Sequence, residues 1–161
     1  MCPKPAFILI AAALLSAVAF NALNSAYASN INGTWLTDDG LGAVQIAQCE
    51  NMICGHIWWL RDALDENGRP LLDENHPDPL QRTRSICGLQ VIGDLRRQND
   101  GSWDAGWIYD PKNGKSYDVA LSLKEANTLV VTGYKGIKIL SQTQFWTRAP
   151  ATLKRCKPKS M

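Results

Sequence analysis

The feature that most constrains the fold is a regular alternation of short β-rich runs with tight-turn signals. Asp39-Gly40, Asn99-Asp100-Gly101 and Asn113-Gly114 are three such signals. Asn-Gly and Asp-Gly pairs favour hairpin turns because these turns need residues that tolerate positive φ. No helical periodicity follows residue 33. The pattern therefore predicts an all-β domain with strands at 33–37, 43–49, 53–60, 89–95, 102–109, 115–123, 128–134 and 137–147.

Apolar and polar side chains alternate within these runs, so each strand has one face for a core and one for water. The clearest apolar series are Tyr117, Val119, Leu121 and Leu123, and Trp103, Ala105, Trp107 and Tyr109. Consecutive antiparallel strands of this kind tend to close, because closure removes exposed edges. We predict an eight-stranded antiparallel up-and-down barrel with one long loop, 61–85, after the third strand. A two-sheet sandwich is the alternative.

The N-terminus has the three parts of a secretory signal. Lys4 supplies the positive charge, residues 6–20 form an uncharged apolar run, and Ala26-Tyr27-Ala28 is a small-x-small cleavage pattern. The run is shorter than the roughly 20 residues that span a bilayer. We therefore predict a signal peptide at 1–28, a barrel domain at 29–148 and a basic tail at 149–161. The expected location is periplasmic or secreted, without stable membrane insertion after cleavage near Ala28.

Four cysteines remain after the signal. An even number in an exported chain favours disulfides, and four cysteines allow three pairings. The short turn between Cys49 and Cys54 favours their pairing, which leaves Cys87 with Cys156. The spacing is not that of a compact zinc site.

Both ends of the predicted barrel resemble lipocalin-like proteins. Gly33-Thr34-Trp35 opens the first strand and Phe145-Trp146-Thr147-Arg148 ends the last. Lipocalin-like barrels have a Gly-x-Trp whose indole plugs one end, with an arginine from the final strand across it. The resemblance implies that Trp35 and Arg148 close this barrel, with the guanidinium covering the indole face.

A second resemblance covers almost the whole chain after the signal. It rests on a linear set of motifs: Gly33-x-Trp35, Cys54-Gly55-x-Ile57-Trp58, Arg84-x-Ile86-x-Gly88, Trp103-x-x-Gly106-x-Ile108-Tyr109-Asp110-Pro111, Gly114-Lys115-x-Tyr117, Leu129-x-Val131-x-Gly133-Tyr134 and Trp146-x-Arg148. The chain resembles a family of small exported bacterial proteins known only as a domain of unknown function. The resemblance implies a lipocalin-like fold and a periplasmic address, and it implies no catalytic residues. Small periplasmic protease inhibitors also use an eight-stranded barrel, and the chain resembles them in this architecture alone.

Charge and motifs argue against several classes of function. The chain has 17 basic and 15 acidic residues, and loss of Lys4 lowers the net charge from +2 to +1, which gives no reason to expect nucleic acid as a partner. Gly114-Lys115-Ser116 lacks the spacing of a phosphate loop. The acidic residues of 65–75 lack a calcium-loop pattern, so we expect no metal and no cofactor. His56, His76 and an Asp62–Asp78 pair offer no recognisable catalytic constellation.

Aromatic residues are the strongest candidates for a binding site. Barrels of this size are either just filled by side chains or hold one small ligand. The candidate ligand-binding residues are Trp58, Trp107, Tyr109 and Tyr117, with Arg82 and Arg84 at the loop exit for an acidic head group. We predict a binding protein for a small apolar or amphiphilic molecule. The alternatives are a filled barrel that contacts or inhibits an envelope protein, and a hydrolase-type enzyme that uses loop 61–85.

Overall fold

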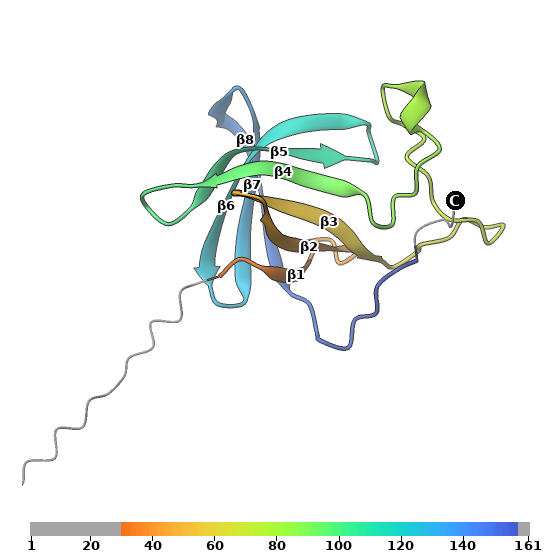
Figure 1. The fold of residues 1–161 in the computed structure, drawn as a ribbon, viewed down its shortest axis with the longest axis horizontal. Coiled ribbons are helices and arrows are strands. Elements are labelled where there is room, and N and C mark those ends of the chain that lie inside the picture. Colours follow the sequence, from red (N-terminus) through yellow and green to blue (C-terminus); the bar gives the residue numbers. More distant parts are fainter. Residues whose placement is uncertain (1–29, 158–161) are drawn as a thin grey trace, which may run out of the picture.

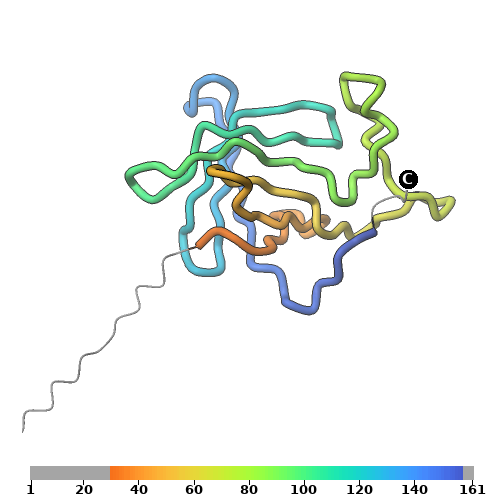
Figure 2. The backbone as a smooth tube through the Cα atoms, in the orientation of Figure 1, coloured from red at the N-terminus to blue at the C-terminus, as the bar shows by residue number. Residues whose placement is uncertain are grey.

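Eight antiparallel strands close into a barrel in chain order in the computed structural model, which describes residues 30–157 (Figures 1 and 2). The strands are β1 (Gly33–Leu36), β2 (Gly42–Cys49), β3 (Met52–Leu60), β4 (Gln90–Arg97), β5 (Trp103–Asp110), β6 (Lys115–Glu125), β7 (Thr128–Lys135) and β8 (Ile137–Arg148). A short 3-10 helix, Pro79–Gln81, lies in the long connection between β3 and β4. Because β8 returns to pair with β1, the predicted barrel is confirmed over the sandwich.

The core consists of the inward-facing residues of all eight strands. Ile46, Ile92, Leu95, Val119 and Leu129 are completely or almost completely buried. They come from β2, β4, β6 and β7, so the predicted alternation does place apolar side chains inside the cylinder. The predicted signal at 1–28 lies outside the described residues. No helix within 30–157 is long and apolar enough to cross a membrane.

Facing bulges in β4 and β5 change the predicted alternation of the fifth strand. Asp94 and Ala105 have φ of 60° and 59°, and the register shifts between Trp103 and Gly106. Trp103 is buried, whereas Ala105 is exposed and Trp107 pairs with Gly93 on the outer face. The expectation that Trp103, Ala105, Trp107 and Tyr109 share one face is therefore wrong, because each bulge adds a residue that reverses the alternation.

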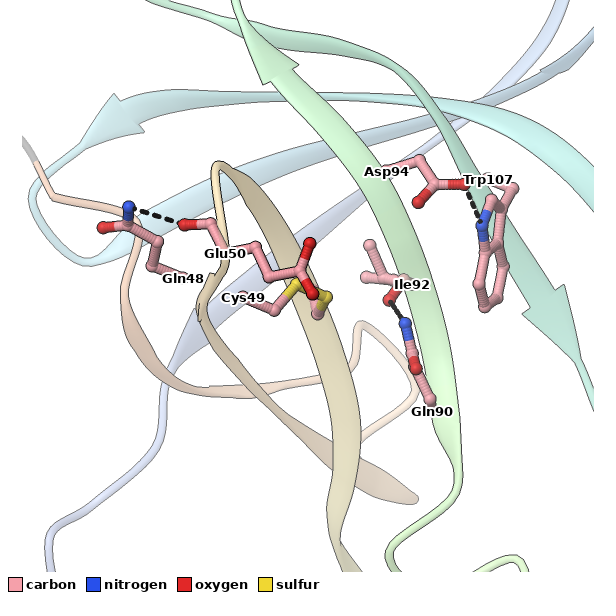
Figure 3. The surroundings of a disulfide bond; sticks show 8 residues. Gln48, Cys49, Glu50, Gln90, Ile92, Asp94 and Trp107 are labelled. Carbon is pink, nitrogen blue, oxygen red and sulfur yellow. Dashed lines mark hydrogen bonds between the residues drawn. A yellow bond between two sulfur atoms is a disulfide. The ribbon is translucent and has the colours of Figure 1, made fainter.

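Both predicted disulfides are present. Cys49–Cys54 joins the ends of β2 and β3 across their turn (Figure 3). Cys87–Cys156 ties the C-terminal tail to the segment before β4, 69 residues earlier in the chain. The tail adds a hydrogen bond from the Cys156 amide to the Trp58 carbonyl. The tail therefore lies against the same side of the barrel as the long connection (Figure 1).

Candidate functional site

One end of the barrel is closed by Trp35. This indole is completely buried and donates to the Ile31 carbonyl at 2.7 Å. The Arg148 guanidinium lies 3.9 Å from the ring centroid and donates to the carbonyls of Asn30 and Asn32, both at 2.6 Å. Burial lowers the pKa of Arg148 from its usual value. A Cβ on Gly33, whose φ is +126°, would lie 2.5 Å from that guanidinium, which explains the glycine of Gly-x-Trp.

The other end of the barrel contains a cavity of about 640 Å³. The loops after β1, β3, β5 and β7 surround it, and these loops lie at the end opposite the turns near Trp35. Its wall is mostly apolar and comes from nearly every strand. The apolar lining residues are Leu41, Ala43, Val44, Ile57, Leu60, Leu71, Ile86, Val91, Ile108, Pro111, Val131, Leu140 and Trp146. This barrel is therefore not fully filled by its own side chains.

A few polar side chains line this cavity. Tyr117, Gln142 and Gln144 are on β6 and β8, and the Trp146 indole donates to the Gln144 side-chain oxygen at 2.9 Å. Gln142, Gln144 and Trp146 lie opposite Gly133, Val131 and Leu129 of β7, all on the inner face. These amides and the hydroxyl group can donate to or accept from a polar group on a molecule bound in the cavity.

Acidic and basic residues share the rim of the cavity. Lys112, in the β5–β6 turn, contacts Asp39 of the β1–β2 loop at 3.1 Å, so this ion pair bridges two loops. A hydrogen bond from the Leu41 amide, with further bonds from Thr37 and Lys112, lowers the pKa of Asp39 to about 2. Asp38, Asp110 and Lys135 complete the charged rim. The interior wall itself carries no charge.

The long loop covers part of the cavity and is fixed there by a buried carboxylate. Asp73 is completely buried and accepts hydrogen bonds from the Tyr109 hydroxyl at 2.6 Å and from Arg84 Nε at 2.8 Å. The Asp73 amide also donates to the Arg84 carbonyl. On either side of this cluster, Leu71 and Ile86 contribute their side chains to the cavity wall. Asp73 therefore holds the loop onto β5.

Two tyrosines on the barrel are hydrogen-bonded to carboxylates. Burial, with the bond to Asp73, raises the pKa of Tyr109 to about 12. Burial, with a 2.8 Å bond to Asp104, raises the pKa of Tyr134 to about 12. Both phenols therefore stay protonated at physiological pH and act as hydrogen-bond donors.

The structure brings together only some of the candidate ligand-binding residues. Tyr109 and Tyr117 line the cavity. Arg84 contacts Asp73 and lies 5.6 Å from the Tyr109 ring centroid, so its charge is already paired. Arg82 is exposed and donates to the His76 carbonyl.

The two tryptophan candidates lie elsewhere. The Trp58 indole meets the C-terminal tail, where it donates to the Leu153 carbonyl and lies 5.2 Å from the Arg155 guanidinium. The Trp107 indole covers Gly93 on the outer face and donates to Asp94 (Figure 3). Neither is among the cavity-lining residues, because Trp107 lies on the outer face of β5 and Trp58 is the extra residue at a register shift between β2 and β3.

Sequence reasoning missed the polar residues of β8 and the buried Asp73. Gln142, Gln144 and Trp146 alternate along one strand, and Trp146 belongs to the closing motif, so period-two spacing could have identified them. Asp73 carries no such signal, since its burial depends on how the loop folds back.

His76 lies near Tyr109, with ring centroids 5.5 Å apart, and its Nδ1 accepts from the Asp78 amide. The Asp78 carboxylate caps the 3-10 helix at Leu80.

Closure by Trp35 and Arg148 at one end and an apolar cavity at the other define a lipocalin-like barrel. The chain belongs to the bacterial family described as "Uncharacterized protein conserved in bacteria (DUF2147)", whose model matches residues 33–148. The family resemblance seen in the sequence is thereby confirmed.

A solved structure has a similar fold. It is described as "Protein HP1028 from the human pathogen Helicobacter pylori belongs to the lipocalin family". The similarity has a TM-score of 0.66 at 20% sequence identity, and it covers 76% of this chain and 84% of the other. No curated protein matches the chain. The match supports the lipocalin-like fold.

Proposed function

We propose that the protein binds a small, partly apolar molecule in the barrel cavity. The observation that carries this proposal is the cavity of about 640 Å³, with an uncharged apolar wall and a polar, charged rim. Ligand pockets commonly fall between roughly 300 and 1,000 Å³ and combine apolar walls with a few polar groups. The apolar part of the ligand contacts Val44, Val91 and Val131, and its polar part meets Gln142, Gln144 or Tyr117.

Gly133 offers a direct test of the cavity. It lies on the inner face of β7, and a Cβ built there meets no atom within 4 Å. Gly133→Phe therefore directs a ring into the cavity from a position whose Cβ meets no neighbour. Thr132→Phe is the matched control, because Thr132 is the next residue of β7 and lies on the outer face opposite Thr143.

The probe is N-phenyl-1-naphthylamine, an uncharged aromatic amine whose fluorescence rises in apolar surroundings. We expect saturable binding to the protein, at least a tenfold weaker affinity for Gly133→Phe, and unchanged affinity for Thr132→Phe. Native mass spectrometry of the protein from its producing cells should show added mass that Gly133→Phe lacks. Probe binding that is equal in all three proteins would contradict binding in the cavity.

We also propose that the protein acts outside the cytoplasm, in the periplasm or after secretion. Two disulfides support this address, because reducing conditions in the cytoplasm disfavour them. The N-terminal sequence, with Lys4, the apolar run and Ala26-Tyr27-Ala28, supports it independently. Fractionation should recover a processed chain that begins near Ser29 outside the cytoplasm. A full-length, reduced chain in the cytoplasmic fraction would contradict the proposal.

A further inference from the structure

One polar side chain of the cavity wall, Gln144, has an orientation that its neighbour fixes. The Trp146 indole donates to the Gln144 side-chain oxygen at 2.9 Å. An indole N–H can only donate, so the amide oxygen faces Trp146 and the amide nitrogen, Nε2, is directed away from it. Trp146 is buried, whereas Gln144 keeps accessible surface because it lines the cavity. The indole therefore determines which end of this amide a bound molecule meets.

The Gln144 Nε2 group is a hydrogen-bond donor that no other residue within 30–157 uses. Gln144 lies opposite Val131, and Gln142, the next inward-facing residue of β8, lies opposite Gly133. A Cβ built at Gly133 would meet no atom within 4 Å, so there is open space beside the two glutamines. A molecule that enters this space can accept a hydrogen bond from Nε2.

The charges of the cavity lining are too far from Gln144 to neutralise an anion there. They lie in the loops or at the strand ends around the mouth: Asp38, Asp39, Asp110, Lys112 and Lys135. Lys112 is paired with Asp39. Lys135, the only cation of β7, is about 13 Å along the strand from Val131. A carboxylate beside Gln144 would lose its hydration without an ion pair, which costs far more free energy than burial of a neutral carbonyl group.

We propose that the cavity selects an uncharged molecule whose carbonyl oxygen accepts a hydrogen bond from Gln144 Nε2. The ligand class is a neutral ketone, ester or amide with an apolar chain, as distinct from a carboxylate. Trp146 is a positioning residue, because its indole holds the amide with the N–H groups toward the ligand. This inference rests on the proposed binding in the cavity and adds the chemistry of the ligand to it.

Three molecules that share a nonyl chain test the selection. The first, 2-undecanone, is uncharged and accepts a hydrogen bond; undecane has no acceptor; decanoate carries a carboxylate. Displacement of N-phenyl-1-naphthylamine near neutral pH measures their affinities. We expect 2-undecanone to bind at least tenfold more tightly than decanoate. Methyl decanoate and decanamide, measured in the same way, show whether the site prefers an ester or an amide.

Two variants remove the donor in different ways. Gln144→Leu removes the whole amide, whereas Gln144→Glu keeps an oxygen for Trp146 but has no N–H to donate. Both should weaken the binding of 2-undecanone about tenfold, which is about 1.4 kcal/mol and typical of one hydrogen bond. Gln144→Leu should not weaken the binding of undecane. Thr143→Leu is the matched control, because Thr143 is the adjacent residue of β8 and lies on the outer face opposite Thr132.

The fluorescent probe separates this inference from the proposed function, since the probe has no carbonyl oxygen. If the probe binds every variant but 2-undecanone binds Gln144→Leu as tightly as the unchanged protein, the carbonyl selection is wrong and binding in the cavity stands. Decanoate that binds more tightly than 2-undecanone would also overturn the selection. A probe that does not bind the unchanged protein would contradict the proposed function itself.

Discussion

At the scale of single residues, backbone conformation explains several side-chain choices. Gly33 is required because a Cβ would meet Arg148, and Gly93 because the Trp107 ring lies 2.5 Å from where a Cβ would be. Ala105 is different, since it has positive φ, carries a Cβ and is exposed. An L-residue in this conformation costs about 1–2 kcal/mol relative to the right-handed region. The β5 bulge therefore carries strain that glycine would relieve.

Ala105→Gly should stabilise the protein by about 0.5–1 kcal/mol. The free energy gained by relieving the strained φ exceeds the free-energy cost of the greater entropy that glycine gives the unfolded chain. Urea or thermal unfolding, with both disulfides intact, measures the change. Ala47→Gly in β2 is the control: Ala47 is also exposed, but its φ is negative, so it should destabilise the protein by about 0.5–1 kcal/mol. If both variants are destabilised equally, Ala105 is not strained.

At the scale of elements, the long connection between β3 and β4 is held by specific contacts at its middle and its end. The Asn75 side chain donates to the Lys112 carbonyl at 3.0 Å, and Asp73 is paired with Arg84. The disulfide of Cys87 then fixes the exit from the loop to the tail. A segment rich in charge, proline and glycine is held here because its one completely buried carboxylate, Asp73, has two partner groups, the Tyr109 hydroxyl and the Arg84 guanidinium.

Asp73→Asn should lower the stability of the loop by about 2–4 kcal/mol, because it removes the charge that pairs with Arg84 and weakens the hydrogen bonds within a buried cluster. Hydrogen exchange should quicken at the amides of Asp73 and Ile86, which bond to carbonyls within the loop. Asp62→Asn is the control, since Asp62 is exposed in the same loop. Unchanged exchange in Asp73→Asn would show that the carboxylate does not hold the loop.

At the scale of the whole molecule, alkaline pH should destabilise the barrel. The pKa values of Tyr109 and Tyr134 are about 12 in the folded protein, above the value near 10 of an unfolded chain. The folded state thus holds both protons more tightly. This stabilisation is fully present below pH 10 and is lost as pH rises from 10 through 12.

The unfolding free energy should therefore decline between pH 10 and 12, by at most about 1.4 kcal/mol per pH unit for each tyrosine. Urea unfolding across this range measures the slope. In Tyr109→Phe and Tyr134→Phe the slope should be smaller, since each variant lacks one of the two tyrosines whose pKa is raised in the folded protein. Equal slopes in all three proteins would contradict this assignment.

The sequence by itself indicated the strands and their order in the chain, because turn chemistry and period-two alternation are local properties. Its motifs indicated the family, and the short turn between Cys49 and Cys54 favoured the disulfide pairing that the structure has. The resemblance to lipocalin-like proteins indicated that Trp35 and Arg148 close one end of the barrel. The aromatic pattern indicated that Tyr109 and Tyr117 line the cavity. The tertiary structure decided the bulges, the outward placement of Trp58 and Trp107, the burial of Asp73 and the size of the cavity. These depend on how eight strands of unequal length close on one another. Whether the closed cylinder is filled or hollow depends on all its inward side chains together, and no local pattern records that sum.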